Sequence, residues 1–66
     1  MKNSISIIIP IYNEAKNIRK LNSKLRKYLK NLRFEIIFVD DDSNDGSQKI
    51  LKKQYSKYRN SRYIIR

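Results

Sequence analysis

Three consecutive carboxylates, Asp40, Asp41 and Asp42, are the strongest candidates in this sequence for binding a ligand or a cation. Adjacent carboxylates repel one another, so holding them together in a fold costs free energy unless something compensates their charge. Helix capping can employ one acid of such a run but not three. We therefore expect a ligand with N–H or O–H donors, or a cation, at this run. The alternative is an exposed, solvated acidic turn.

A second segment, residues 10–14, offers an aromatic ring and another carboxylate. The ring of Tyr12 can stack on a base, and Glu14 can accept hydrogen bonds from an amide or a ribose hydroxyl. The alternative interpretation is structural: Pro10 ends a strand, Tyr12 packs, and Asn13 and Glu14 cap a helix.

The composition narrows the chemistry further. The 66 residues include no Cys and no His, which excludes disulfides, thiolate metal sites and the commonest general base. Gly46 is the one glycine, which excludes a phosphate loop of the Walker type. The length allows one small domain, residues 1–66, for which we expect weak stability or self-association.

The net charge of +10 is unevenly distributed along the chain. Eight basic side chains and no acid lie in residues 16–33, and seven more, again without an acid, lie in residues 49–66. Basic surfaces attract phosphate backbones, anionic lipid headgroups and nucleotides. A solvated helix face is the alternative for both segments.

The first half of the chain predicts a strand and a long helix. The nearly continuous Ile-rich run at residues 4–9 favours a strand covered on both faces, which we expect to end at Pro10 because proline has no N–H for a sheet. Asn13 is expected to be the N-cap of a helix of about 16 to 18 residues, with Glu14 in its first turn. The apolar stripe of this helix consists of Ile18, Leu21, Leu25, Leu29 and Leu32.

The second half predicts a strand, a helix and another strand. An apolar strand at residues 34–39 leads into the turn-forming residues 40–47, a helix covers about residues 47–58, and Tyr63 begins a third strand. This order predicts an α/β fold with a parallel sheet and right-handed crossovers. Ligands of such sheets bind beyond the carboxyl ends of the strands, where the two polar segments should meet.

Two motifs taken together resemble the opening of family 2 glycosyltransferases: SIIIPIYNE at residues 6–14 and FEIIFVDDDSNDGS at residues 34–47. The similarity covers essentially the whole chain and is closest to the dolichyl- or polyprenyl-phosphate mannosyl- and glucosyltransferase branch. It implies the N-terminal β-α-β-α-β half of a GT-A (Rossmann-like) fold that binds a nucleotide sugar. It also implies transfer of that sugar to an acceptor.

The resemblance also implies roles for individual residues. Pro10, Tyr12 and Glu14 would line the base and ribose pocket, Val39 would form its floor, and Asp41 would bind an N–H of the base. The metal motif, the acceptor side and the catalytic base of the family follow in later strands, so no catalytic or metal-binding residue is assigned here. A structural role beside the pocket is implied for Asp40, Asp42, Ser43, Asp45 and Gly46.

The partners implied by the resemblance are a GDP- or UDP-linked sugar as donor and a polyprenyl phosphate as acceptor. Mg or Mn is expected for the complete enzyme but not on these residues. The chain looks too short to be the whole enzyme, so we expect it to be inactive alone. A truncated gene, a gene-boundary error and a split enzyme completed by another chain remain open as its origin, and a complementing chain or self-association is the partner considered. We expect it in the cytoplasm or at the cytoplasmic membrane face, because the longest apolar run, residues 7–11, is far below the roughly 20 residues of a membrane span.

Two other functional classes remain open. The charge of +10 and the five Tyr residues suggest a small basic nucleic-acid-binding module. The basic residues surround the helices, however, and the three Asp would repel a phosphate backbone, so no nucleic-acid partner is expected. The third class is a helix-mediated interaction module, since a short parallel sheet leaves edges open to a partner.

Overall fold

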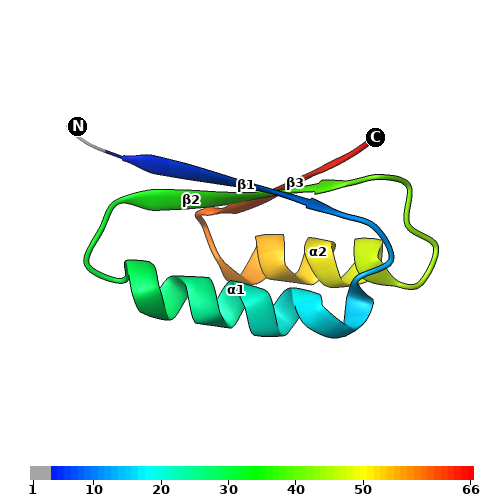
Figure 1. The fold of residues 1–66 in the computed structure, drawn as a ribbon, viewed down its shortest axis with the longest axis horizontal. Coiled ribbons are helices and arrows are strands. Elements are labelled where there is room, and N and C mark those ends of the chain that lie inside the picture. The colour runs from blue at the N-terminus through cyan, green and yellow to red at the C-terminus, as the bar shows by residue number, and fades with distance from the viewer. Residues whose placement is uncertain (1–3) are drawn as a thin grey trace.

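Strands and helices alternate along residues 4–66, which the computed structural model describes (Figure 1). The three strands form one parallel sheet in the order β1-β2-β3. This confirms the predicted α/β fold with its β-α-β-α-β order. The elements are β1 (Ile5–Ile11), α1 (Ala15–Leu29), β2 (Phe34–Asp40), α2 (Ser47–Lys57) and β3 (Ser61–Ile65).

Both helices cover the same face of the sheet, and Figure 1 shows them below the strands. The strands are added in one direction across the sheet, and a right-handed crossover then places each helix on the same side. The opposite face is open, with Ile8 65% exposed and Ile64 53% exposed. The expectation that the first strand is covered on both faces is therefore wrong for residues 4–66.

The core lies between the sheet and the helix layer. Alternate strand residues point into it, and Ile36 and Phe38 of β2 are at most 1% exposed. Burying side chains of this size contributes about 1.5–3 kcal/mol each. These two residues of the central strand form one buried cluster with Ile11, Ile18 and Leu51.

A polar seam joins the two helices to β3 inside this core. Asn22 of α1 is fully buried and donates to the side-chain oxygen of Gln54 on α2 at 2.6 Å. Arg26 donates to the hydroxyl of Ser61 at 2.7 Å, and its guanidinium lies 3.9 Å from the centroid of the Tyr58 ring. Because an unpaired buried amide costs about 1–3 kcal/mol, the Asn22–Gln54 pair favours one packing of the helices.

β1 continues through Pro10 to Ile11, beyond its predicted end. The N–H of Ile5 donates to the carbonyl of Arg33, and the carbonyl of Ile11 accepts from the N–H of Asp41. The odd-numbered residues of β1 therefore bond to β2, and the nitrogen of Pro10 faces away from it. The missing N–H removes no bond from the sheet, so the prediction that Pro10 ends the strand is wrong.

α1 begins later and ends earlier than predicted. Asn13 is not its N-cap, because the backbone there is left-handed with φ 50°. Glu14 takes the N-cap position without a side-chain cap bond, so it precedes the first turn rather than lying in it. The helix has 15 residues, and Leu32, which was placed in its apolar stripe, lies beyond its end and is 51% exposed.

The remaining boundaries differ from the predictions by one or two residues. β2 includes Asp40, α2 ends at Lys57, and β3 begins at Ser61. Tyr55 of α2 is 55% exposed and packs edge to face on Tyr63 of β3, with the ring centroids 5.9 Å apart. Among residues 4–66 no helix is long and apolar enough to span a bilayer.

Candidate functional site

The segments that follow β1 and β2 lie side by side at the carboxyl edge of the sheet. The N–H of Asp41 donates to the carbonyl of Ile11 at 3.0 Å. The N–H of Asn13 donates to the hydroxyl of Ser43 at 2.7 Å, and the N–H of Asn44 donates to the side-chain oxygen of Asn13 at 3.0 Å. The two loops therefore form one surface, as their position after parallel strands predicts.

Asp40 is fully buried at the end of β2, and its carboxylate holds the turn that follows. It accepts hydrogen bonds from the N–H and the hydroxyl of Ser43, at 2.9 and 2.5 Å, and from the side-chain amide of Gln48 at 3.2 Å. Donors within the chain thus compensate this carboxylate. Asp41 and Asp42 remain exposed, so the expectation of a compensating ligand is wrong for one acid of the run and stays a prediction for two.

Asp45 joins the N-termini of both helices. Its carboxylate accepts from the N–H of Ala15, the first residue of α1, at 3.0 Å. It also accepts from the N–H and the hydroxyl of Ser47, the first residue of α2, at 3.0 and 2.5 Å. The bond from the Ser47 hydroxyl is the main cause that holds the pKa of Asp45 below its ordinary value of 3.8. The charge also lies where two helix dipoles favour an anion.

Left-handed backbone recurs in the two loops, at Asn13 (φ 50°), Asp42 (φ 58°) and Gly46 (φ 94°). Asn and Asp adopt this conformation more readily than other side chains, and Gly adopts it without strain. A Cβ atom at Gly46 would meet nothing within 4 Å, so the backbone angle rather than a lack of space favours glycine there.

Four of the predicted nucleotide-binding residues lie together on the open side of the sheet. Pro10 and Val39 are partners in the register of β1 and β2, and their side chains point away from the helices. Tyr12 and Asp41 each follow two residues later, one residue beyond the ends of β1 and β2, and we infer from continued alternation that they lie on this side. Both are exposed, and no side-chain hydrogen bond within residues 4–66 uses the Tyr12 hydroxyl or the Asp41 carboxylate. We call these four residues the shelf.

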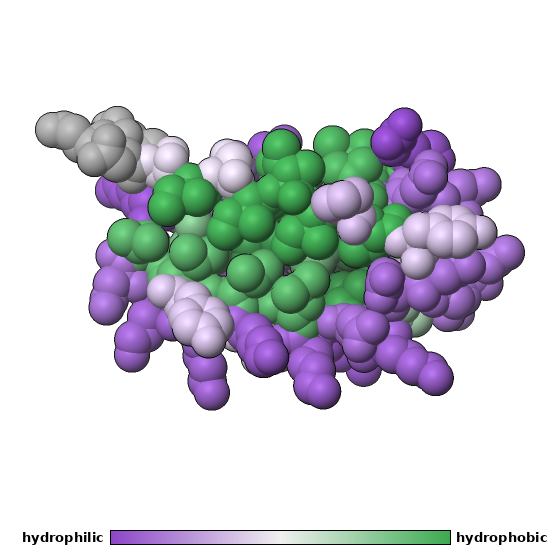
Figure 2. Space-filling view, in the orientation of Figure 1, coloured by the Kyte–Doolittle hydropathy of each residue, from purple (hydrophilic) through white to green (hydrophobic). Residues whose placement is uncertain are grey.

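Glu14 lies apart from the shelf, beside a groove between β1 and α1. The groove has a volume of about 200 Å³, below the roughly 300–1,000 Å³ of ordinary small-molecule pockets. Figure 2 shows apolar side chains gathered in the middle of one side of the molecule, within a polar rim. Residues 4–66 thus supply an open shelf and a narrow groove rather than an enclosed pocket. The groove is lined by Ile9, Pro10, Ile11, Glu14, Asn17, Ile18 and Leu21.

The acidic run does not converge on one ion. The carboxylate of Asp40 is turned toward Ser43 and Gln48 on the helix side of the sheet, whereas Asp41 points to the open side by strand alternation. Within the described part of the chain, no group of three or more acidic side chains is arranged to hold a metal ion. The residues present therefore do not fit a metal centre of their own.

Sequence reasoning missed two residues that build this edge, Ser47 and Gln48. The hydroxyl of Ser47 accepts the N–H of Glu14 at 3.2 Å, and the amide of Gln48 holds Asp40. A local signal for Ser47 was present, because an Asp two residues before it is typical of an Asx turn at the start of a helix. Gln48 had no such signal, since its partner lies eight residues earlier in another element.

Several known proteins are similar in sequence to most of this chain. A dolichol-phosphate mannosyltransferase from Pyrococcus furiosus is 43% identical over 54 residues, which are 82% of this chain and 15% of that protein. The glycosyltransferase AglE of Haloferax volcanii is 37% identical over 62 residues, 92% of this chain and 20% of AglE. An undecaprenyl-phosphate 4-deoxy-4-formamido-L-arabinose transferase from Proteus mirabilis is 40% identical over 53 residues, 77% of this chain and 16% of that enzyme.

The chain spans at most about a fifth of the length of these relatives. Residues 6–66 match the family model described as Glycosyl transferase family 2, which covers both strand-end loops and everything between them. Together with the parallel β-α-β-α-β sheet, this match shows that the chain belongs to glycosyltransferase family 2.

Proposed function

We propose that this protein supplies the nucleotide-binding part of the donor site of a glycosyltransferase that uses a GDP- or UDP-linked sugar. The observation that supports this most is the shelf of Pro10, Tyr12, Val39 and Asp41 at the carboxyl edge of a parallel sheet. It offers an exposed ring for stacking, an apolar floor, and a carboxylate that is free to accept an N–H. These three features together suit a nucleobase.

Each residue of the shelf has a role in this proposal. The ring of Tyr12 stacks on the base, Pro10 and Val39 form the floor, and Asp41 accepts an N–H of the base. Glu14, at the N-cap of α1 and beside the shelf rather than on it, accepts hydrogen bonds from the ribose hydroxyls. The neighbouring bond from Asp41 N–H to the Ile11 carbonyl, at 3.0 Å, fixes the backbone that presents this carboxylate.

We extend the proposal to the complete enzyme. Its acceptor is a polyprenyl phosphate, which the names of the dolichol-phosphate and undecaprenyl-phosphate relatives support. It works in the cytoplasm, where its donor is supplied, and Mg or Mn is held by residues outside these 66. Further chain, a complementing partner or a second copy covers the open face of the sheet, and residues 1–66 alone do not transfer sugar.

An NMR titration of the chain with GDP and with UDP, each with and without Mg²⁺, tests the donor site. We expect saturable amide shifts at Tyr12, Glu14 and Asp41, with roughly millimolar affinity, because half a site buries little of the ligand. Magnesium should not be needed. A folded chain whose Tyr12 and Asp41 signals stay unchanged with both nucleotides would contradict the proposal.

Two pairs of exposed residues provide matched variants for this titration. Asp41→Asn should abolish saturation, because a hydrogen bond to a charged acceptor is worth about 1.5–3 kcal/mol, whereas Asp42→Asn should leave it nearly unchanged. Tyr12→Ala should likewise abolish saturation, and Tyr28→Ala, at an 84% exposed position on α1, should not. Equal losses within either pair would show that the shelf is not the binding site.

A further inference from the structure

The outer face of the helix layer is covered by eight lysines. All eight are exposed. α-Helical periodicity turns seven of them away from the buried residues Ile18 and Leu51, and Lys52 lies on the flank of α2. Because the sheet covers the inner side of both helices, this outer face is the side of the molecule opposite the shelf (Figure 1). We call it the lysine plate, which consists of Lys16, Lys20, Lys24, Lys27, Lys49, Lys52, Lys53 and Lys57.

The charge of the lysine plate is not compensated within the chain. Neither α1 nor α2 contains an Asp or a Glu, and no plate lysine forms an ion pair with an acid among residues 4–66. The acids lie elsewhere. Glu35 bonds to Arg62 and Ser6 on the open face of the sheet, and the other five lie in or beside the strand-end loops. The two helices thus present one sign of charge to an external partner.

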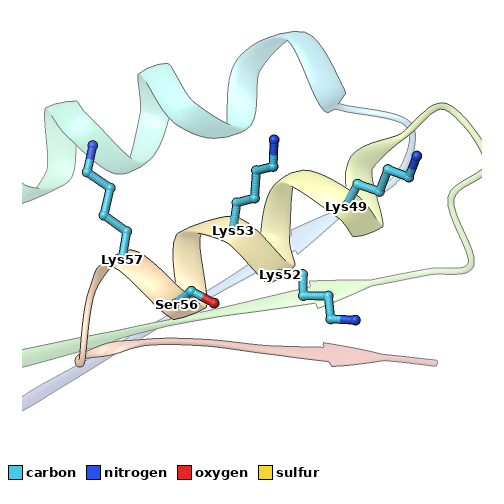
Figure 3. A pocket seen from close by; sticks show the side chains of 5 residues that line it. All are labelled: Lys49, Lys52, Lys53, Ser56 and Lys57. Atoms are coloured by element: carbon cyan, nitrogen blue, oxygen red, sulfur yellow. The ribbon is translucent and has the colours of Figure 1, made fainter.

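The lysines of α2 do not enclose a ligand pocket. Figure 3 shows Lys49, Lys53 and Lys57, spaced four residues apart, projecting from the same side of the helix. The shallow depression between these side chains is lined by residues of α2 alone, with Lys52 and Ser56 completing it. A gap with no wall from another element suits a broad charged surface better than a single small anion.

We propose that the lysine plate docks on a membrane surface that carries anionic phospholipids. The plate lies on two neighbouring helices, and several lysines can reach such a surface at once while their charges stay in water. Attraction between a row of lysines and anionic headgroups adds up from residue to residue and decays within a Debye length, about 8 Å at physiological salt. Docking of this kind needs no specific contact at any one lysine.

The residue types of the plate favour a membrane over a nucleic acid. Nine exposed cations lie on α1 and α2, and eight of them are Lys, with Arg19 as the one Arg. The hydrated point charge of Lys suits a fluid array of headgroups, whereas Arg forks are suited to fixed phosphates. Tyr55 of α2 packs against Tyr63 of β3 and so does not offer a free ring to a base beside the α2 lysines. Tyr28, 84% exposed and one turn beyond Lys24, borders the plate where an amphipathic ring can sit at headgroup level.

Docking through the plate has a consequence for the shelf. With the helix layer against the bilayer, the open face of the sheet with Tyr12 and Asp41 points toward the aqueous phase. The docking goes beyond the proposed function and does not rest on it. The docking itself depends on the lysines and not on the shelf.

Co-sedimentation of the 66-residue chain with lipid vesicles tests the proposal. We expect binding to vesicles in which one third of the phosphatidylcholine is replaced by phosphatidylglycerol, and none to pure phosphatidylcholine, at about 0.1 M salt. Changing three plate lysines in one variant, Lys20→Gln, Lys27→Gln and Lys53→Gln, should weaken binding roughly a hundredfold. Circular dichroism should show the same helix content as for the unchanged chain, since the three side chains are exposed.

The matched control removes the same charge from outside the plate. Arg33→Gln, Arg59→Gln and Arg66→Gln together give the same net charge but leave the plate intact, and should weaken binding less than about fivefold. Equal losses in the two triple variants would overturn the proposal, because net charge rather than the plate would then decide binding. Retention of the chain by RNA, with no sedimentation on the anionic vesicles, would overturn it as well. Failure of nucleotide binding in the earlier titration would leave these results unaffected.

Discussion

The two faces of the sheet differ in how completely their side chains are partnered. On the helix side Ile36, Phe38 and Asp40 are at most 1% exposed, and Arg26 Nε is the one buried side-chain polar atom among residues 4–66 without a partner. On the open side Ile8 is 65% exposed, and Asp41 has an unpaired carboxylate. Strand alternation produces this difference, since each step along β2 moves a side chain from one face to the other. Residues that stabilise the fold and residues free to bind a ligand thus alternate in sequence.

The largest expected effect comes from substituting neighbours on opposite faces of β2. Phe38→Ala removes the largest fully buried side chain and should lower the free energy of unfolding by about 3–5 kcal/mol. That is most of the stability that a domain of this size has. Val39→Ala, one residue further on and half-buried, should cost about 1 kcal/mol or less.

Urea unfolding followed by circular dichroism measures this pair. We expect Phe38→Ala to be largely unfolded without denaturant and Val39→Ala to keep a cooperative transition. Similar midpoints for both variants would mean that the open face is covered in solution, for example by a second copy of the chain.

A smaller effect is expected from the adjacent acids Asp40 and Asp41. Asp40→Asn replaces an acceptor of three hydrogen bonds by an amide that cannot accept all of them, and should cost about 1–3 kcal/mol of stability. Asp41→Asn should change stability by less than about 0.5 kcal/mol, because its carboxylate is exposed. Urea unfolding measures the loss of stability in both variants. If Asp41→Asn lowered the free energy of unfolding as much as Asp40→Asn, the distinction between a buried structural acid and an exposed binding acid would be wrong.

The order of elements and the edge that bears the loops were predictable from the sequence. The apolar runs and the turn formers between them predict five elements, and the parallel order follows from helices placed between buried strands. Position at the strand ends was enough to predict that the segments of Tyr12 and Asp41 meet at one edge of the sheet. These predictions depend on residue patterns along the chain, that is, on apolar runs and on the turn-forming residues between them.

Predictions failed where an atom's direction rather than a residue's type decided the outcome. Pro10 continues β1 because its nitrogen faces away from β2, and a sequence does not show which way that nitrogen points. Asn13 was expected to cap α1, but its side chain accepts from Asn44 in the other loop. Gln48 holds Asp40 across two elements, a contact without any local pattern.

The smallest expected effect concerns the acid dependence of two carboxylates from the two faces, Asp45 and Glu35. Hydrogen bonds from Ser47 hold the pKa of Asp45 below 3.8, and hydrogen bonds from Ser6 and then Arg62 hold the pKa of Glu35 below 4.5. A carboxyl whose pKa is lowered by folding stabilises the fold above its unfolded pKa, and this contribution disappears as the pH falls through the folded value. The melting temperature should therefore fall as the pH drops below about 4.5, and Asp45→Asn and Glu35→Gln should each make that fall slightly smaller. Thermal melts between about pH 6 and pH 2 measure it. Asp45 links the N-termini of both helices, whereas Glu35 joins the three strands on the open face. If only Glu35→Gln reduced the fall in melting temperature, the acid sensitivity of this fold would lie on the open face of the sheet.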